Sequence, residues 1–310
     1  QSIKTGPLRA VKAHKEVRAK WNRLRRQIVL RIGQLTNDPV QISGMSLQLV
    51  EIVKPSTAQP HDSNLYIALC YSLAKTIVLQ AEVEVSAAKH SAGPLAQVAF
   101  SLLETLDGFA PIFFAKLVQH SGGWLIPIVV PDHDEDGTPW SSSEQFIKVS
   151  GWRKSTIGQG HETPEEYANR VSAIMRVYFS ILKIRPGQKA LDPMFQLPRF
   201  WTWFARMVGG TKLLHKAISP QLIYTALDVL GVDAENLWGQ QWIEMLALVH
   251  EGVTTGYENG KLIGGKGSQG SRSRVLVALE KTVLDRRSNS LDDEVDDSSN
   301  LCTMFQKLSV

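Results

Sequence analysis

The chain has 310 residues, of which 43% are hydrophobic and 21% are charged, close to the average of globular domains. This composition excludes an intrinsically disordered protein, a collagen-like rod and a mucin-like stalk. Two cysteines, Cys70 and Cys302, are too few for a disulfide scaffold and favour a reducing compartment. The longest apolar run, Leu65 to Leu79, is interrupted by Lys75 and is shorter than the roughly 20 residues that span a bilayer.

The net charge of +4 hides an uneven distribution along the chain. Residues 1–31 contain ten lysines and arginines against a single acid, Glu16, so this segment carries +9 and the remainder −5. Such an asymmetry favours a surface that meets phosphate or nucleic acid. The alternative is a solvated helix face.

The front of the chain predicts regularly spaced helices. Apolar side chains recur every fourth residue from Leu65 and the stripe continues to Val85, as in an amphipathic helix of about six turns. Asp62 or Ser63 is expected to cap it. Helical spacing also covers the ranges 8–36, 43–54, 93–106 and 109–121.

The pattern changes in the middle of the chain. The run Leu125 to Val130, bounded by glycines and Pro131, is the only strand-like stretch. Residues 131–163 are rich in Asp, Gly, Ser and Pro and predict a long acidic connection. It begins like a calcium loop, but Glu144 lies one position beyond the required closing ligand, which favours a solvated loop.

The back half opens with a clear helix start, because Thr163 to Glu166 spells a capping box with proline at the first helical position. Ser219 and Pro220 open another helix, predicted to end at Gly231. Asp233 is expected to cap the next helix, so that the two form an antiparallel hairpin. Helical spacing also covers the ranges 197–208 and 270–285.

These elements predict an all-α fold, specifically a HEAT-like helical-repeat solenoid of helix pairs of roughly forty residues each. A globular bundle is the alternative. We expect a basic N-terminal helix over 1–30, a single HEAT-like domain over 31–285 and an acidic tail over 286–310. The halves of the domain, 31–130 and 164–285, are joined by the acidic loop 131–163.

No catalytic constellation is visible in the sequence. Gly260 to Lys266 has the spacing of a phosphate loop, but Gly267 stands where a serine or threonine is required, so a turn between helices is favoured. The sequence contains no metal-ligand pair of His or Cys residues and no nucleophile elbow.

Basic side chains at helical spacing form the main candidate site. Lys116 and His120 are four residues apart and share a helix face. Lys75 is a lone cation on an apolar stripe, where a lysine snorkels or meets an anion. Because helix ends in a solenoid line up along one edge, these residues and the first helix are expected to converge on a polyphosphate. Independent solvated lysines are the alternative.

Five blocks of sequence carry a family resemblance: Ile32 to Asn37, Ala74 to Val85, Gly93 to Ala96, Arg170 to Tyr178 and Gln240 to Glu251. Together they resemble the C-terminal domain of the GLFG-lethal family of mRNA-export factors over roughly residues 20–285. The resemblance implies a HEAT-like domain at the cytoplasmic face of the nuclear pore that activates an ATPase and is not itself an enzyme.

The resemblance also implies partners. Members bind a DEAD-box RNA helicase, in fungi with inositol hexakisphosphate as a tether, and stimulate its ATPase cycle and RNA release. They also contact the C-terminal segment of an FG-repeat nucleoporin. We expect a monomeric domain with no metal and no membrane contact. Direct RNA binding through the basic N-terminal helix is the alternative function, weakened by the lack of stacking aromatics there apart from Trp21.

Site residues follow from matching the family's pocket onto this chain. Its lysines fall on Lys75 and Lys116, and one of a following basic pair falls on His120. The other member of that pair is replaced by Gln119, and a histidine of some fungal members is replaced by Leu79.

Two more basic residues and three tryptophans complete the candidate sites. Arg31 matches the basic residue before the Ile32 block. Lys89, His90 or the first helix is expected to compensate for the missing charges. For the nucleoporin peptide, the candidate anchors are Trp201, Trp238 and Trp242, whose alternative role is core packing.

Overall fold

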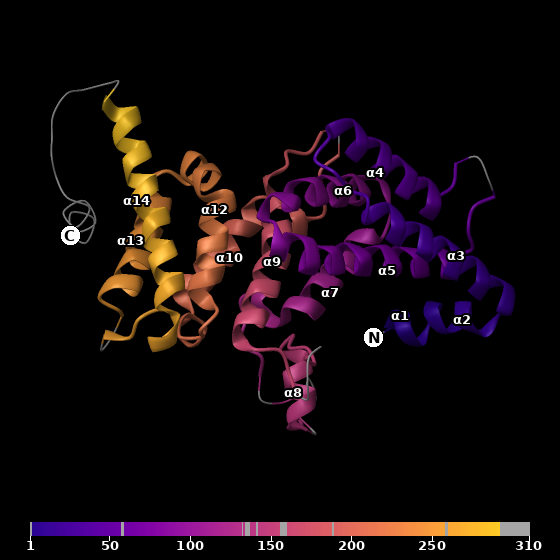
Figure 1. Ribbon diagram of the computed structural model, residues 1–310, viewed down its shortest axis with the longest axis horizontal. Helices are drawn as coiled ribbons and strands as arrows, with labels where there is room; N and C mark the ends of the chain where they lie inside the picture. Colours follow the sequence, from indigo (N-terminus) through magenta and orange to yellow (C-terminus); the bar gives the residue numbers. More distant parts are fainter. Residues whose placement is uncertain are drawn as a thin grey trace.

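The protein is all-helical, as predicted, in the computed structural model shown in Figure 1. The structure describes residues 2–56, 59–131, 133, 137–140, 142–155, 160–187, 189–257 and 260–291. Within these ranges the only β pairing consists of isolated bridges, and no strand is formed.

Fourteen α-helices account for most of the described chain. The first seven are α1 Ser2–Thr5, α2 Pro7–Ala13, α3 Lys15–Ile32, α4 Pro39–Val53, α5 Ser63–Gln80, α6 Ala92–Thr105 and α7 Phe109–Ser121. The others are α8 Ser143–Val149, α9 Pro164–Lys183, α10 Pro198–Gly209, α11 Thr211–Leu214, α12 Ser219–Trp238, α13 Gln240–Thr254 and α14 Gln269–Leu291. A π-helical segment, Ala81–Val85, continues α5.

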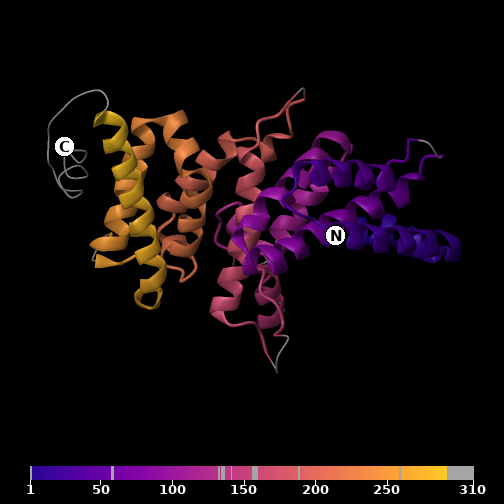
Figure 2. The same ribbon diagram turned by 45° about the horizontal axis from the view of Figure 1, so that its top comes forward.

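The molecule is elongated, with α1–α7 toward one end, α9 near the centre and α12–α14 at the other end (Figures 1 and 2). In the front half, α3 packs on α5, α5 on α7, α4 on α6, and α6 on α9. Helix α12 then packs on both α9 and α14. The short helix α8 projects from the side of the molecule (Figure 1).

Helix α5 is the central helix of the front half, and its sequence explains both its start and its burial. The Asp62 carboxylate accepts hydrogen bonds from the backbone N–H groups of Asn64 and Leu65, which are free at a helix start. Its stripe from Leu65 to Ile77 is buried, each large side chain contributing about 1.5 to 3 kcal/mol. The segment Ser63–Val85 is long and apolar enough to cross a membrane, but here it lies in the core between α3 and α7.

The predicted first helix over 8–36 is wrong in one respect, because the chain breaks at His14. This residue is extended, with φ −100° and ψ 119°, and it separates α2 from α3. Both helices pack on α5, through Leu8 of α2 and Trp21 of α3 among others. The chain folds back at His14, so that α2 and α3 lie separately against α5. We refer to Ser2–Ala13, which holds α1 and α2 and forms a hairpin with α3 through the turn at His14, as the N-terminal hairpin.

The predicted helix end at Gly231 is also wrong. Helix α12 continues to Trp238 and ends at Gly239, whose φ of 50° and ψ of −120° suit only glycine. Gly231 lies inside α12 and is buried, and a Cβ atom there would approach only Leu227, at 4.0 Å. Tertiary packing of α12 against α9 and α14 therefore outweighs the low helix propensity of one glycine.

The strand-like run Leu125 to Val130 is not a strand. A 3-10 turn over Gly122–Leu125 begins it, and Gly122 packs so closely on the end of α8 that a Cβ atom would lie 2.3 Å from the Ser150 oxygen. The connection 131–163 contains α8, but most acids of its calcium-like start lie outside the described residues. At the other end α14 runs to Leu291, beyond the predicted end at 285, and residues 292–310 lie outside the described range.

Candidate anion-binding site

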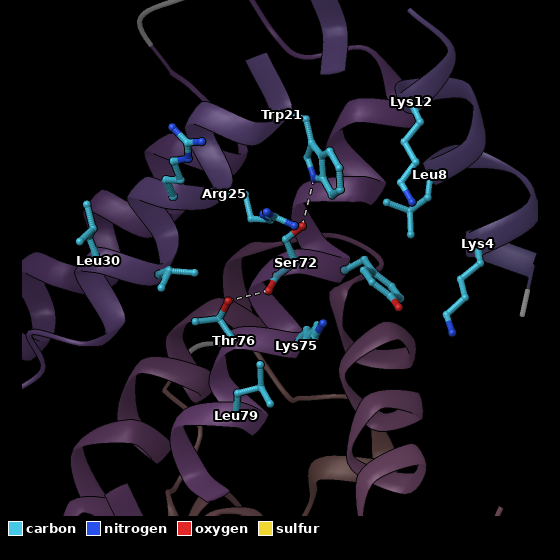
Figure 3. A pocket seen from close by; sticks show the side chains of 13 residues that line it. Lys4, Leu8, Lys12, Trp21, Arg25, Leu30, Ser72, Lys75, Thr76 and Leu79 are labelled. Carbon is cyan, nitrogen blue, oxygen red and sulfur yellow. Dashed lines mark hydrogen bonds between the residues drawn. The ribbon is translucent and has the colours of Figure 1, made fainter. Parts of the chain in front are cut away.

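A pocket of about 700 Å³ lies beside Lys75, between the N-terminal hairpin, α3 and α5 (Figure 3). Its lining includes five cationic residues from four helices: Lys4, Lys12, Arg25, Arg26 and Lys75. None of the lining residues is acidic, and none of the five cations forms an ion pair within the described part of the chain. The pocket therefore concentrates positive charge that nothing in the described protein neutralises.

A buried tryptophan positions the α3 wall of the pocket. Trp21 Nε1 donates a hydrogen bond to Ser72 Oγ on α5 at 3.0 Å, and Ser72 Oγ donates to the Ala68 oxygen at 2.7 Å. The Arg25 guanidinium lies 5.1 Å from the centroid of the Trp21 ring, a cation–π arrangement that leaves its N–H groups free for other partners. Ordered packing thus holds Arg25 at the pocket edge.

Three exposed aliphatic side chains share the pocket with the cations. Val29, Leu30 and Leu79 are 50%, 63% and 37% exposed. Leu79 lies one helical turn beyond Lys75 on α5 and contributes no charge, as its sequence predicted. The pocket therefore combines a cationic wall with an apolar rim.

Lys116 lies next to this pocket rather than in its lining. Its Nζ atom is 4.0 Å from the centroid of the Tyr71 ring, and Tyr71 does line the pocket. Lys116 Nζ also donates to Gln119 Oε1 at 2.7 Å. Burial, with a smaller contribution from the positive charge of Lys4, lowers the pKa of Lys116 to about 8. The lysine is thus electrostatically coupled to the hairpin.

His120 belongs to a different, partly buried ionic cluster. Its Nδ1 lies 3.0 Å from Glu82 Oε1, and Arg153 Nη2 lies 2.6 Å from Glu82 Oε2. Arg170 also contacts Glu82, donates to the backbone oxygens of His120 and Gly151, and pairs with Glu162. Burial opposes the charge of Arg170, but Glu162 and then Glu82 raise its pKa. The cluster joins the π-helical segment, α7 and α9 to the base of the α8 projection.

Arg31 and Lys89, the two remaining predicted site residues, lie outside both the pocket and the ionic cluster. Arg31 lines a separate groove of about 730 Å³ that also contains Lys20 and Arg23. Lys89 stacks over Tyr224 of α12 at 4.8 Å. The structure therefore places Lys75 in the pocket with Lys116 adjacent, while His120, Arg31 and Lys89 lie elsewhere.

Sequence reasoning did not single out Lys4, Lys12, Arg25 and Arg26 individually as lining the pocket. The signal was present as the +9 charge of residues 1–31. Helical spacing alone does not say which of these side chains face α5, because that depends on the fold of the hairpin.

The candidate tryptophans differ in accessibility. Trp242 is completely buried, and its Nε1 atom has no hydrogen-bond partner among the described residues. Trp201 and Trp238 are partly exposed, with ring centroids 5.1 Å apart. Of the three, only Trp201 and Trp238 have exposed surface that a partner can contact. The ring centroid of Trp242 lies 6.5 Å from that of Trp238.

The glycine-rich stretch forms a packed turn between α13 and α14. Gly264 and Gly265 have φ values of 77° and 67°, and the Gly264 N–H donates to the Leu214 oxygen at 2.7 Å. The Arg272 guanidinium donates to the oxygens of Ile263 and Gly265.

Among the described residues, no group of three His, Cys, Asp or Glu side chains is placed to hold a metal ion.

The fold resembles solved complexes of the C-terminal domain of Saccharomyces cerevisiae Dbp5 with Gle1 and IP6. One such chain matches with a TM-score of 0.74 and 22% identity, covering 89% of this chain and 88% of that chain. Another chain, from a complex with a Gle1 variant, matches with a TM-score of 0.77 and 22% identity. The match covers 92% of this chain and 90% of that chain.

Two curated relatives are named mRNA export factors. The GLE1 protein of Saccharomyces cerevisiae is 24% identical over 269 residues, which cover 86% of this chain and 46% of the relative. The gle1 protein of Schizosaccharomyces pombe is 26% identical over 283 residues, which cover 88% of this chain and 53% of the relative. The chain thus spans about half the length of the curated relatives it matches.

The family model described as GLE1-like protein matches residues 1–250. That range contains the N-terminal hairpin, the Lys75 pocket and all the sequence blocks from Ile32 to Tyr178. The chain belongs to the GLE1-like protein family, which confirms the resemblance.

Proposed function

We propose that this chain binds inositol hexakisphosphate in the Lys75 pocket and through it engages a DEAD-box RNA helicase. The observation that carries the proposal is the convergence of five cations, from four helices, on a pocket with no acidic lining residue. The complexes of similar fold contain Gle1, IP6 and the Dbp5 C-terminal domain, which supports the same ligand here.

The ligand chemistry matches the pocket. Inositol hexakisphosphate is a compact polyanion, and charge-assisted hydrogen bonds from lysine and arginine are its natural partners. Lys75 and Arg25 supply direct contacts from α5 and α3. Lys116 supplies positive charge from behind Tyr71.

A tether would also allow this basic pocket to associate with a basic surface of the helicase. A polyphosphate placed between this pocket and a cationic surface of the helicase converts repulsion into attraction. If the complex favours the helicase conformation that has released RNA, binding shifts the helicase toward that state and accelerates its ATPase cycle. The chain then acts as an mRNA-export factor at the cytoplasmic face of the nuclear pore and as an activator rather than an enzyme.

The architecture fits this role as a HEAT-like stack of helix pairs. Packing of α3 on α5 and α5 on α7, beside α4 on α6 and α6 on α9, supports two parallel rows of helices. In this organisation residues 31–285 form one domain in two halves. The first 30 residues add the basic hairpin and α3.

The second partner is a nucleoporin segment at the opposite end of the molecule. The partly exposed pair Trp201 and Trp238 offers an aromatic surface on α10 and α12. Trp242 supports this surface without reaching it.

The test is calorimetry with inositol hexakisphosphate on the wild type and on single variants. Lys75→Gln and Arg25→Gln should each weaken binding roughly tenfold, as expected for loss of one charge-assisted contact. Lys212→Gln removes an equal charge from an exposed site in the back half and should change little. An ATPase assay of a DEAD-box helicase, with this chain and with or without the ligand, then measures activation. Equal binding by Lys75→Gln and Lys212→Gln would overturn the site.

A further inference from the structure

The N-terminal hairpin forms one complete wall of the Lys75 pocket. Lys4 of α1 and Lys12 of α2 face the pocket from one side, and Arg25 of α3 lies on the other (Figure 3). Lys75 rises from α5 between them (Figure 3). A ligand that fills the pocket therefore touches both the N-terminal hairpin and the helices α3 and α5.

The hairpin is attached to the rest of the protein mainly through α2, which packs on α5 and α3. Leu8 and Val11 are its buried side chains, at 5% and 1% exposure, and both belong to α2. Helix α1 has no buried residue. Neither Gly6 nor His14 makes a side-chain capping hydrogen bond at the start of the helix that follows it. Segments with little apolar burial and uncapped ends open at low free-energy cost.

Electrostatic repulsion opposes the closed arrangement when no anion is bound. Lys4 and Lys12 approach Arg25, Arg26 and Lys75 without an acidic residue in the lining. The charge of Lys4 also reaches Lys116, where it helps to lower the pKa of that lysine. Like charges gathered in one pocket repel, and a polyanion placed between them adds an attraction to each cation that offsets this repulsion.

We propose that the hairpin is a ligand-dependent clamp, in which Lys4 and Lys12 bind phosphate groups of the polyanion and thereby fix α1 and α2 over the pocket. This inference rests on the proposed function of the pocket and adds two binding residues and a closing step. Because the ligand stabilises only the closed state, it shifts the hairpin toward closure by its extra affinity for that state. The closed hairpin then becomes part of the surface presented to the helicase.

The test combines binding with amide hydrogen exchange on the full chain, using inositol hexakisphosphate as the probe. Lys4→Gln/Lys12→Gln removes both hairpin cations, and Lys15→Gln/Lys20→Gln removes two exposed cations of α3 that do not line the pocket. Glutamine keeps helix propensity close to that of lysine, so folding is retained. Deleting the hairpin is avoided because it would expose the core around Leu8.

The clamp predicts slower exchange of the residue 7–13 amides on ligand addition in the wild type and in Lys15→Gln/Lys20→Gln. It also predicts that Lys4→Gln/Lys12→Gln loses this protection and at least roughly tenfold in affinity. If Lys75→Gln weakens binding but the hairpin variant matches its control and residues 7–13 gain no protection, the clamp is wrong and the pocket stands. If inositol hexakisphosphate does not bind the wild type, both are wrong.

Discussion

Lys116 Nζ lies 4.0 Å from the centroid of the Tyr71 ring, and Tyr71 in turn lines the pocket beside Lys75. One aromatic side chain thus connects a buried cation with a pocket of exposed cations. Because burial lowers the pKa of Lys116 to about 8, this lysine titrates near physiological pH, unlike an ordinary lysine. Its charge, and with it the strength of the site, is therefore sensitive to pH.

The first prediction concerns that pH dependence. Below about pH 8 Lys116 is protonated and attracts the polyanion, and above that value its charge is lost in the free protein. A bound polyanion raises its pKa, so binding takes up protons above pH 8 and affinity falls as pH rises from 7 to 10. The measurement is calorimetry in buffers of different ionisation enthalpy. Lys116→Gln is the reference. Inositol hexakisphosphate also titrates in this pH range, and its contribution is the same with both proteins. Identical pH profiles would exclude Lys116 from the site.

The second prediction adds charge to the apolar rim. Leu79 lines the pocket one turn from Lys75 and is 37% exposed, so a longer cationic side chain there reaches the same ligand. Leu79→Lys should raise inositol hexakisphosphate affinity by roughly five- to tenfold at low salt, with the gain decreasing as salt screens it. Val83→Lys places the same charge on an exposed residue outside the lining. A comparable gain from Val83→Lys would mean that only net charge matters.

The third prediction concerns the ionic cluster at the base of α8. Glu82 is buried and contacted by His120, Arg153 and Arg170, so Glu82→Gln removes the carboxylate that these three side chains share and leaves Arg170 with Glu162 alone. We expect a loss of about 3 kcal/mol in the free energy of unfolding, measured by urea denaturation. Glu84→Gln, at an exposed position of the same π-helical segment, should cost less than about 0.5 kcal/mol. Equal stability of the two variants would show that the cluster contributes nothing net.

The fourth prediction compares two glycines of α12 and its end. Gly231→Ala should stabilise by about 0.5 to 1 kcal/mol, because the position is helical and the new Cβ meets only an ordinary contact. Gly239→Ala should destabilise by roughly 1 to 2 kcal/mol, because its φ of 50° is costly for alanine although space is available. Thermal unfolding of both variants measures the signs. A destabilised Gly231→Ala would show that the packing of α12 leaves no room for a Cβ atom at this position.

Local sequence signals predicted the elements that depend only on neighbouring residues. Asp62 caps α5 and the Thr163–Glu166 capping box starts α9 as expected, since such hydrogen bonds span only a few residues. The concentration of positive charge in residues 1–31 and the family blocks were likewise readable without a structure. These signals were sufficient to predict an all-α domain of this family.

Long-range packing decided the rest. The break at His14 turns the hairpin back onto α5, and that turn brings Lys4 and Lys12 opposite Lys75. His120 lies four residues after Lys116 but faces Glu82 rather than the pocket. Helix α7 presents it to the π-helical segment and α9. The sequence by itself determined the number of cations in residues 1–31. Only the tertiary structure decided which of them share a pocket, because contacts between helices far apart in the chain are set by how their buried faces pack.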